Sequence, residues 1–214
     1  MKLTLLIAVI GTLFSGGQMH AAPVSLGATD VGSYTQHGAF HLRNEYAVGS
    51  FISNPNFEFR DYAIFDLSGI NGTITSAVLR ANSGGDVGRF EDVTISFHSY
   101  AGSIPALTAG TANFGDLASG NVYGSGTVSS GFPDNTDIDF NLNAVALIDL
   151  NLSSGLIAIA GSQPVATNSA GVFGDTPASG VTLILDVKAV PEPSSAILLI
   201  AAAGIVTRRS RRKT

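Results

Sequence analysis

The sequence predicts an all-β domain, a sandwich or barrel of many short strands. Short apolar runs follow one another through most of the 214 residues, and glycine, serine, threonine and asparagine separate them. Several runs alternate apolar and polar residues, which is the period of a strand with one buried face. Many such runs with turn signals between them are typical of sandwiches and barrels.

Six segments show the strand pattern most clearly. In the first, Phe57 and Phe59 share a face, Asp61 is a further candidate for that face, and the pattern then shifts to Ala63, Phe65 and Leu67. In the second, Ile74 is expected on the face opposite Leu79, because successive side chains of a strand point to opposite faces. The six predicted strands are 57–67, 74–82, 93–100, 138–142, 157–159 and 181–187.

One segment of the body, 143–150, has a helical pattern. Asn143 is a favourable N-cap, and the segment ends near Ser153 and Gly155. At most two turns long, this helix is expected to pack across one end of the sandwich. The sequence therefore predicts a β-sandwich with one short helix.

The first 22 residues have the pattern of a secretory signal peptide. Lys2 supplies the positive start, 3–14 the apolar region, and Ala21 and Ala22 the small residues near a cleavage site. The alternative is a buried first helix or strand, which the lysine and alanine flanks disfavour. The pattern predicts export, cleavage by a signal peptidase and a mature domain that begins at Pro23.

The segment 190–214 combines a rigid polar motif, an apolar run and a basic end. Pro191, Glu192 and Pro193 favour an extended, accessible chain because proline fixes φ. As a helix the next 14 residues would span roughly 21 Å, less than the ~30 Å of a hydrocarbon core. Length alone favours an interfacial segment or a buried helix, but five cationic residues at the end favour a short transmembrane helix held on the cytoplasmic side. These residues are Arg208, Arg209, Arg211, Arg212 and Lys213.

These C-terminal residues resemble the PEP-CTERM sorting signal of Gram-negative bacteria. The Pro-Glu-Pro motif, the apolar run 196–206 and the arginine-rich end stand in the same order and at the same place in the chain. The resemblance implies recognition by an exosortase, a membrane protease that removes the tail. It also implies transient anchoring in the inner membrane, a final place at the cell surface, in the envelope or in the extracellular matrix, and a bacterium that makes an exopolysaccharide or biofilm.

Between the two end segments, 23–189 form one acidic domain. It contains 15 acidic and five basic residues, a net charge of −10, against −5 for the whole chain. An acidic surface argues against binding nucleic acid or anionic lipid. The chain has no cysteine, which excludes disulfides, thiol catalysis and cysteine-ligated zinc. It has no tryptophan, a residue often used as a stacking platform for sugars.

The stretch 59–80 resembles the core of jelly-roll domains related to carbohydrate-binding modules and to the disaggregatase-associated domain. It reads FDLS at 65–68 and GTITSAVL at 72–79, so that one strand ends, a glycine-containing turn follows and the next strand returns. The resemblance implies a jelly-roll-like β-sandwich. It does not identify a function, because such sandwiches serve many roles.

Asp137 and Asp139 belong to the densest cluster of side-chain oxygens and are candidate calcium ligands. In a strand they would point to the same side, and the resemblance to jelly-roll sugar-binding modules implies a structural calcium. The alternative is a solvated acidic strand edge, which the absence of EF-hand spacing favours. No other cofactor is predicted. His37 and His41 are four residues apart, but in a glycine-containing, β-rich stretch we expect an exposed pair rather than a metal site.

No catalytic motif stands out in the sequence. It contains no G-x-S-x-G nucleophile elbow, no H-E-x-x-H metal motif and no Walker motif. We therefore expect a non-enzymatic exported protein with a structural, adhesive or weak carbohydrate-binding role and a polysaccharide as partner. The alternative is a carbohydrate-active enzyme or its ancillary sugar-binding module, because the paired carboxylates of glycoside hydrolysis are arranged in space and not in sequence.

Overall fold

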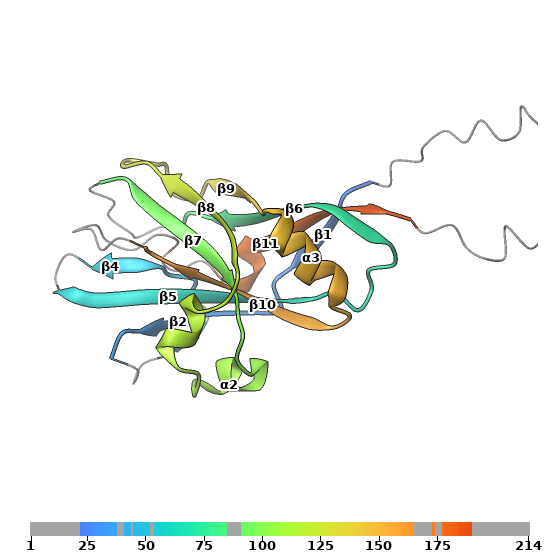
Figure 1. Ribbon diagram of the computed structural model, residues 1–214. Helices are drawn as coiled ribbons and strands as arrows, with labels where there is room; N and C mark the ends of the chain where they lie inside the picture. Colours follow the sequence, from blue (N-terminus) through green and yellow to red (C-terminus); the bar gives the residue numbers. More distant parts are fainter. Residues whose placement is uncertain are drawn as a thin grey trace, which may run out of the picture.

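Two antiparallel β-sheets form most of the structure (Figure 1). The computed structural model describes residues 22–37, 41–43, 45–51, 54–84, 91–164, 173 and 177–189. The four-stranded sheet has the order β1 (Val24–Gly27), β11 (Val181–Lys188), β6 (Thr73–Asn82) and β9 (Asp137–Asn141). The seven-stranded sheet has the order β3 (His41–Arg43), β2 (Asp30–Thr35), β5 (Asn54–Asp66), β10 (Leu156–Ser162), β7 (Val93–Ser99) and β8 (Val122–Val128), and β4 (Gly49–Phe51) pairs with part of β5.

The predicted β-sandwich is confirmed, and each of the six predicted strands is present. They correspond to β5, β6, β7, β9, β10 and β11. The sequence did not single out β8, whose residues are VYGSGTV. Its glycines and serine leave few apolar side chains to alternate, so its place in the sheet comes from pairing with β7 rather than from its own pattern.

The segment 61–65 of β5 is buried on both faces, and the predicted group of Ala63, Phe65 and Leu67 lies together in the core between the sheets. Asp61, Ala63 and Phe65 follow one another on one face, and Ala63 and Phe65 belong to the core between the sheets. On the opposite face Tyr62 and Ile64 are also buried, in a second apolar cluster. Because neither face of the segment 61–65 meets water, the polar alternation that would reveal a half-buried strand is missing there.

The core between the two sheets contains a row of aromatic rings. The ring centroids of Phe97 and Phe140 lie 4.8 Å apart, those of Phe140 and Phe173 6.0 Å, and those of Phe173 and Tyr46 5.4 Å. Apolar residues of both sheets, among them Leu79, surround this row. The row joins the four-stranded sheet to the seven-stranded one by dispersion and burial of apolar area.

A bulge in β6 changes the face on which Ile74 lies. The pairing of β6 with β11 slips by one residue between Asp186 and Val187, so that Ile74 is buried together with Leu79. The prediction that Ile74 lies opposite Leu79 is therefore wrong. The extra residue of a bulge reverses the alternation on one side of it. The side chain of Asn151 holds the backbone of Ile74 beside the bulge, accepting from its N–H at 2.8 Å and donating to its carbonyl at 2.9 Å.

The predicted helix is confirmed as α3 (Ala144–Leu152), but it is not the only short helix. The side chain of Asn143 accepts hydrogen bonds from the backbone N–H groups of Val145 and Ala146 at 2.9 and 3.1 Å, as an N-cap does. A second helix, α2 (Ile104–Ala109), and the 3-10 helices η1 (Phe114–Ala118) and η2 (Ala178–Gly180) correct the prediction of one helix. These elements are too short to show a helical period, and Gly110, in the left-handed conformation, ends α2.

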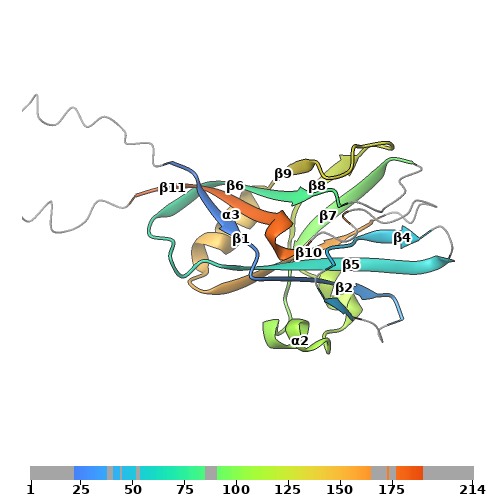
Figure 2. The ribbon, with the colours of Figure 1, turned by 180° about the vertical axis from the view of Figure 1, so that it is seen from behind.

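The first and last strands of the sandwich bring its N- and C-terminal ends to the same side of the molecule (Figures 1 and 2). β1 lies antiparallel to β11, with Val24 opposite Leu185, so the start of the first strand and the end of the last are neighbours. The predicted signal peptide, apart from Ala22, and the predicted sorting segment 190–214 lie outside the described residues. Among the helices in the described part of the chain, none is long and apolar enough to span a membrane.

Candidate functional site

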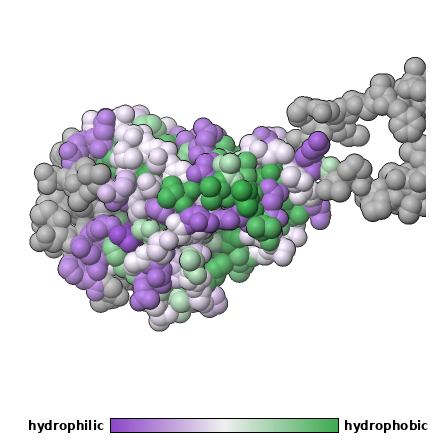
Figure 3. All heavy atoms as spheres, in the orientation of Figure 1, coloured by the Kyte–Doolittle hydropathy of each residue, from purple (hydrophilic) through white to green (hydrophobic). Residues whose placement is uncertain are grey.

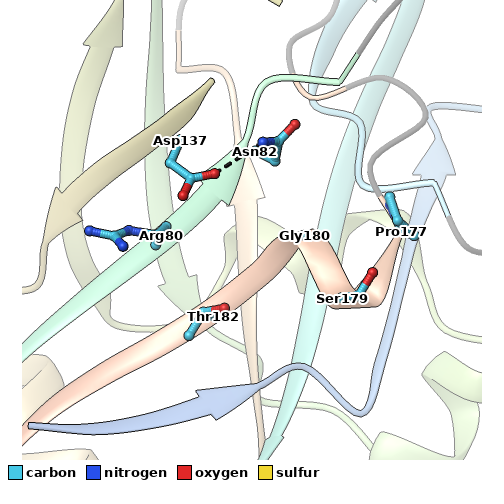
Figure 4. Close-up of a pocket in the computed structure, with 7 residues that line it drawn as sticks. All are labelled: Arg80, Asn82, Asp137, Pro177, Ser179, Gly180 and Thr182. Carbon is cyan, nitrogen blue, oxygen red and sulfur yellow. Dashed lines mark hydrogen bonds between the residues drawn. The ribbon is translucent and has the colours of Figure 1, made fainter. Parts of the chain in front are cut away.

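A polar groove opens on the outer face of the four-stranded sheet, with a volume of about 290 Å³ (Figure 4). Its floor comes from β6, β9 and β11, and one side comes from the segment around η2. The lining residues are Arg80, Asn82, Asp137, Pro177, Ser179, Gly180 and Thr182.

Strand alternation places the polar side chains in this groove. Leu79 and Ala81 of β6 point into the core, so the intervening Arg80 and the following Asn82 point to the outer face. In the register with β9, Arg80 lies directly opposite Asp139, and Asn82 lies opposite Asp137. The outer face therefore carries two cross-strand polar pairs side by side.

Arg80 and Asp139 form a bidentate ion pair. The guanidinium Nε lies 2.6 Å from Oδ1 of Asp139, and Nη2 lies 2.8 Å from Oδ2. These hydrogen bonds hold the pKa of Asp139 below its usual range, and the same carboxylate raises the pKa of Arg80. The pair is exposed to solvent, so it orients the two side chains more than it stabilises the fold.

Asn82 and Asp137 form the second pair, and both line the groove. The amide Nδ2 of Asn82 donates to Oδ1 of Asp137 at 3.0 Å. Figure 4 shows this bond, with Arg80 and Thr182 below it and Ser179 to one side. The groove thus combines a guanidinium, an amide, a carboxylate and two hydroxyl groups within one hollow, a set that can both donate and accept hydrogen bonds.

The structure brings Asp137 and Asp139 to the same side of β9, as the sequence predicted, and both are exposed. Each has a partner, the amide of Asn82 or the guanidinium of Arg80, so a cation at Asp139 would have to compete with an arginine. Among the described residues there is no group of three or more histidine, aspartate or glutamate side chains placed to hold a metal. The calcium site stays a prediction. His37 is exposed, and the side chain of His41 lies outside the described part of the structure.

A second polar cluster lies inside the sandwich, and sequence reasoning gave only a hint of it. Asp61 is fully buried on the inner face of β5, between Ser33 of β2 and Gly161 of β10. It stands where the partner of β5 changes from β10, which reaches Gly161, to β4, which begins opposite Phe59. The single signal in the sequence was an acidic residue directly before the run YAIF at 62–65.

The buried polar atoms of this cluster lack ordinary hydrogen bonds within the described part of the chain. They are Oγ of Ser33, the hydroxyl of Tyr46 and both carboxylate oxygens of Asp61. Burial raises the pKa of Asp61 to about 8, although the backbone N–H groups of Gly161 and of Asp61 itself favour the charged form. Burial, and then the charge of Asp61, raise the pKa of Tyr46. At neutral pH Asp61 is therefore mostly protonated.

A histidine–serine pair lies on the outer face of the seven-stranded sheet. Nε2 of His98 and Oγ of Ser162 are 2.9 Å apart, a distance that would suit a base and a nucleophile. Both side chains are buried, and burial lowers the pKa of His98. The pair is thus a buried side-chain contact between β7 and β10.

Comparisons with known proteins add a distant likeness. No protein-family model matches the chain, and no curated protein matches it. Among solved structures, it is similar to part of an exo-β-1,3-galactanase from Phanerochaete chrysosporium, solved with galactose, and to a variant of that enzyme solved with β-1,3-galactotriose. The TM-scores are 0.28 and 0.27, the identities 13% and 12%, and each alignment covers 77% of this chain and 29% of the galactanase. The chain thus spans less than a third of the enzyme's length.

Proposed function

We propose that this chain is an exported β-sandwich that binds a polysaccharide weakly through the groove around Asp137, and that its role is structural or adhesive. The observation that carries the proposal is the groove itself, a hollow of about 290 Å³ whose lining is polar. A sugar presents several hydroxyl groups, each of which donates and accepts. Arg80, Asn82, Asp137 and Thr182 offer both kinds of group on one rigid sheet.

The composition of the groove also supports weak binding. No aromatic ring is among the described residues that line the groove, so recognition by these residues would rest on hydrogen bonds. Each such bond replaces a bond to water and contributes little net free energy. Repeated units of a polysaccharide could offset this weakness by engaging several copies of the protein at once.

The end segments support a place outside the cytoplasm. The signal-peptide pattern of 1–22 and the resemblance of 190–214 to a PEP-CTERM signal favour export, processing by signal peptidase and an exosortase, and transient anchoring in the inner membrane. The cell would then be a Gram-negative bacterium with an exopolysaccharide matrix. The resemblance of 59–80 to jelly-roll carbohydrate-binding modules favours the same class of ligand.

The acidic domain is a poor match for nucleic acid, and the groove favours a neutral or cationic glycan. Asp137 contributes its carboxylate to the groove, and Arg80 is already neutralised by Asp139. An anionic polymer would meet net negative charge over the whole domain.

A glycan array with a parallel hydrolysis screen tests the proposal on the full chain. We expect that the unmodified chain binds a glycan on the array and that Asp137→Ala or Asn82→Ala abolishes this binding. Ser125→Ala, an exposed position on β8 of the other sheet, serves as the matched control and should bind normally. If the unmodified chain binds no glycan, the proposal is overturned. If the unmodified chain hydrolyses a glycan and Asp137→Asn abolishes that hydrolysis, the chain is an enzyme instead.

A further inference from the structure

The helix α3 presents an apolar stripe to solvent. Val145, Ile148 and Leu152 are 41%, 60% and 81% exposed, and their spacing of three and four residues puts them on one helix face. Leu156, just beyond the helix, is 54% exposed. Figure 3 shows hydrophobic residues gathered over the face that α3 occupies in Figure 1. Contiguous apolar surface of this kind marks a site of interaction with another protein or with a membrane.

A hollow beside the stripe lies next to the point where the chain leaves the sandwich. Ile148 and Leu152 of α3 line one side of this hollow, and Gly72 and Thr73, at the start of β6, line the other. Its volume is about 490 Å³, and its lining is largely apolar. Thr73 pairs with Lys188, the last residue of β11. The stripe, the hollow and the exit of the C-terminal segment therefore lie toward the same end of the domain (Figures 1 and 2).

The segment that follows β11 is too short to let this end of the domain move far from the membrane. In the proposed function, on which this inference rests, the run 196–206 is anchored in the inner membrane and the domain lies on the side opposite 208–213. Seven residues, 189–195, join Lys188 to that run, and fully extended they reach about 25 Å. The domain 23–189 is about 40 Å across, so the tether is shorter than the domain itself. The end that carries the stripe is therefore held nearest the lipid.

We propose that the stripe of α3 rests on the zwitterionic lipid surface of the membrane in which the tail is anchored. Its apolar side chains enter the boundary between headgroups and acyl chains, as those of interfacial helices do. The tether gives them an effective concentration on the order of millimolar, so a short stripe suffices. One weak membrane signal binds reversibly and stable anchoring takes two, so removal of the tail releases the domain. Until then the contact keeps the Pro-Glu-Pro motif at the surface, within reach of a membrane protease.

Charge selects a zwitterionic surface over an anionic one. Asp149 of α3 and Asp66, which pairs with Leu156, stand beside the stripe, and Lys188 is the cation at the exit of the chain. Helices that lie on anionic membranes carry lysine or arginine on their polar face, and α3 has neither. The whole domain has a net charge of −10, which repels an anionic surface and equally a second copy of the domain. The stripe therefore binds through its apolar side chains alone.

Fluorescent labels on single cysteines test the contact, because the chain has no native cysteine. The full chain is inserted into phosphatidylcholine vesicles that contain a nitroxide-labelled lipid, which quenches a label that touches the bilayer. The label on Leu152→Cys should be quenched about fivefold more than the label on Thr94→Cys, an exposed position on the other sheet. Adding Val145→Ser and Ile148→Ser to Leu152→Cys should reduce the quenching to the level of the Thr94 control.

A label on Leu199→Cys, within the apolar run, separates this contact from the anchor. If Leu199→Cys is quenched and Leu152→Cys is not, the tail lies in the bilayer without the stripe touching lipid. That result overturns the docking and leaves the proposed anchoring in place. If Leu199→Cys is not quenched, the tail is not in the bilayer, and the anchoring and the docking are both overturned.

Three further results would assign the stripe to a different partner. In vesicles of equal parts phosphatidylcholine and phosphatidylglycerol, Leu152→Cys should be quenched less, and stronger quenching there would overturn the choice of a zwitterionic surface. Disulfides between Leu152→Cys chains, without quenching by lipid, would assign the stripe to a second copy. Slower removal of the tail in cells for Ile148→Ser with Leu152→Ser, again without lipid contact, would assign it to the protease.

Discussion

The carboxylate of Asp61 lies over the backbone of Gly161, its partner in the neighbouring strand. A side-chain carbon built on Gly161 would lie 2.2 Å from Oδ1 of Asp61, closer than any two such atoms can approach. The glycine therefore provides the space in which a buried acid fits between two packed sheets. The two residues are a matched pair, and the interior site depends on both.

Replacement of Gly161 by alanine should destabilise the fold by about 1–3 kcal/mol, because the added methyl group forces the buried carboxylate to move. Urea unfolding measures this loss. Gly155→Ala is the control, since nothing lies within 4 Å of the carbon it would add. The double variant with Asp61→Ala and Gly161→Ala should lose less free energy of unfolding than the sum of the losses in the two single variants. Additive losses would contradict the contact between the two residues.

Stability should fall as the pH rises from about 4 to about 8. In the folded state burial raises the pKa of Asp61 to about 8, whereas an unfolded aspartate titrates near its usual value of about 3.9. Within this window the folded chain holds a proton that the unfolded chain has released, so each pH unit costs about 1.4 kcal/mol at most. Asp61→Asn, which cannot ionise, should remove this slope. Unfolding of the two proteins at pH 5 and pH 8 measures the difference, and parallel slopes would contradict the assignment.

The bulge in β6 should depend on Asn151. Asn151→Ala removes the acceptor and the donor that satisfy the backbone of Ile74, and it should lower the free energy of unfolding by about 1–3 kcal/mol. Ser154→Ala, an exposed change in the turn after the same helix, is the control and should change stability little. If both variants unfold at the same urea concentration as the unmodified chain, the bulge is held by packing alone.

The N-cap of α3 should contribute about 1 kcal/mol to stability. Asn143→Ala removes the acceptor for two backbone N–H groups at the start of the helix. Asn143→Asp keeps an acceptor there and adds a favourable negative charge, so it should unfold close to the unmodified chain. Comparison of the two variants by thermal unfolding separates the cap from the bond that Asn143 Nδ2 donates to Val122. If Asn143→Ala and Asn143→Asp lose equal stability, the loss comes from the hydrogen bond to Val122 and not from the cap.

Part of the groove could be predicted from the sequence. Asp137 and Asp139 were expected on one side of a strand, because alternation within a strand is local. Their partners could not be predicted, since Arg80 and Asn82 lie more than 50 residues away and meet them only through the register of β6 with β9. Nothing in either segment specifies that register by itself.

By itself, the sequence determined the all-β class of the domain, six of its strands and the start of α3 at Asn143. Strand alternation and helix capping depend on residues that are close together in the sequence. It also contains the two end segments that suggest export. The tertiary structure decided which strands are neighbours, that Ile74 turns inward at a bulge, and that Asp61 is buried over Gly161. These features arise from pairing between strands that are far apart in the sequence, which no local pattern of residues specifies.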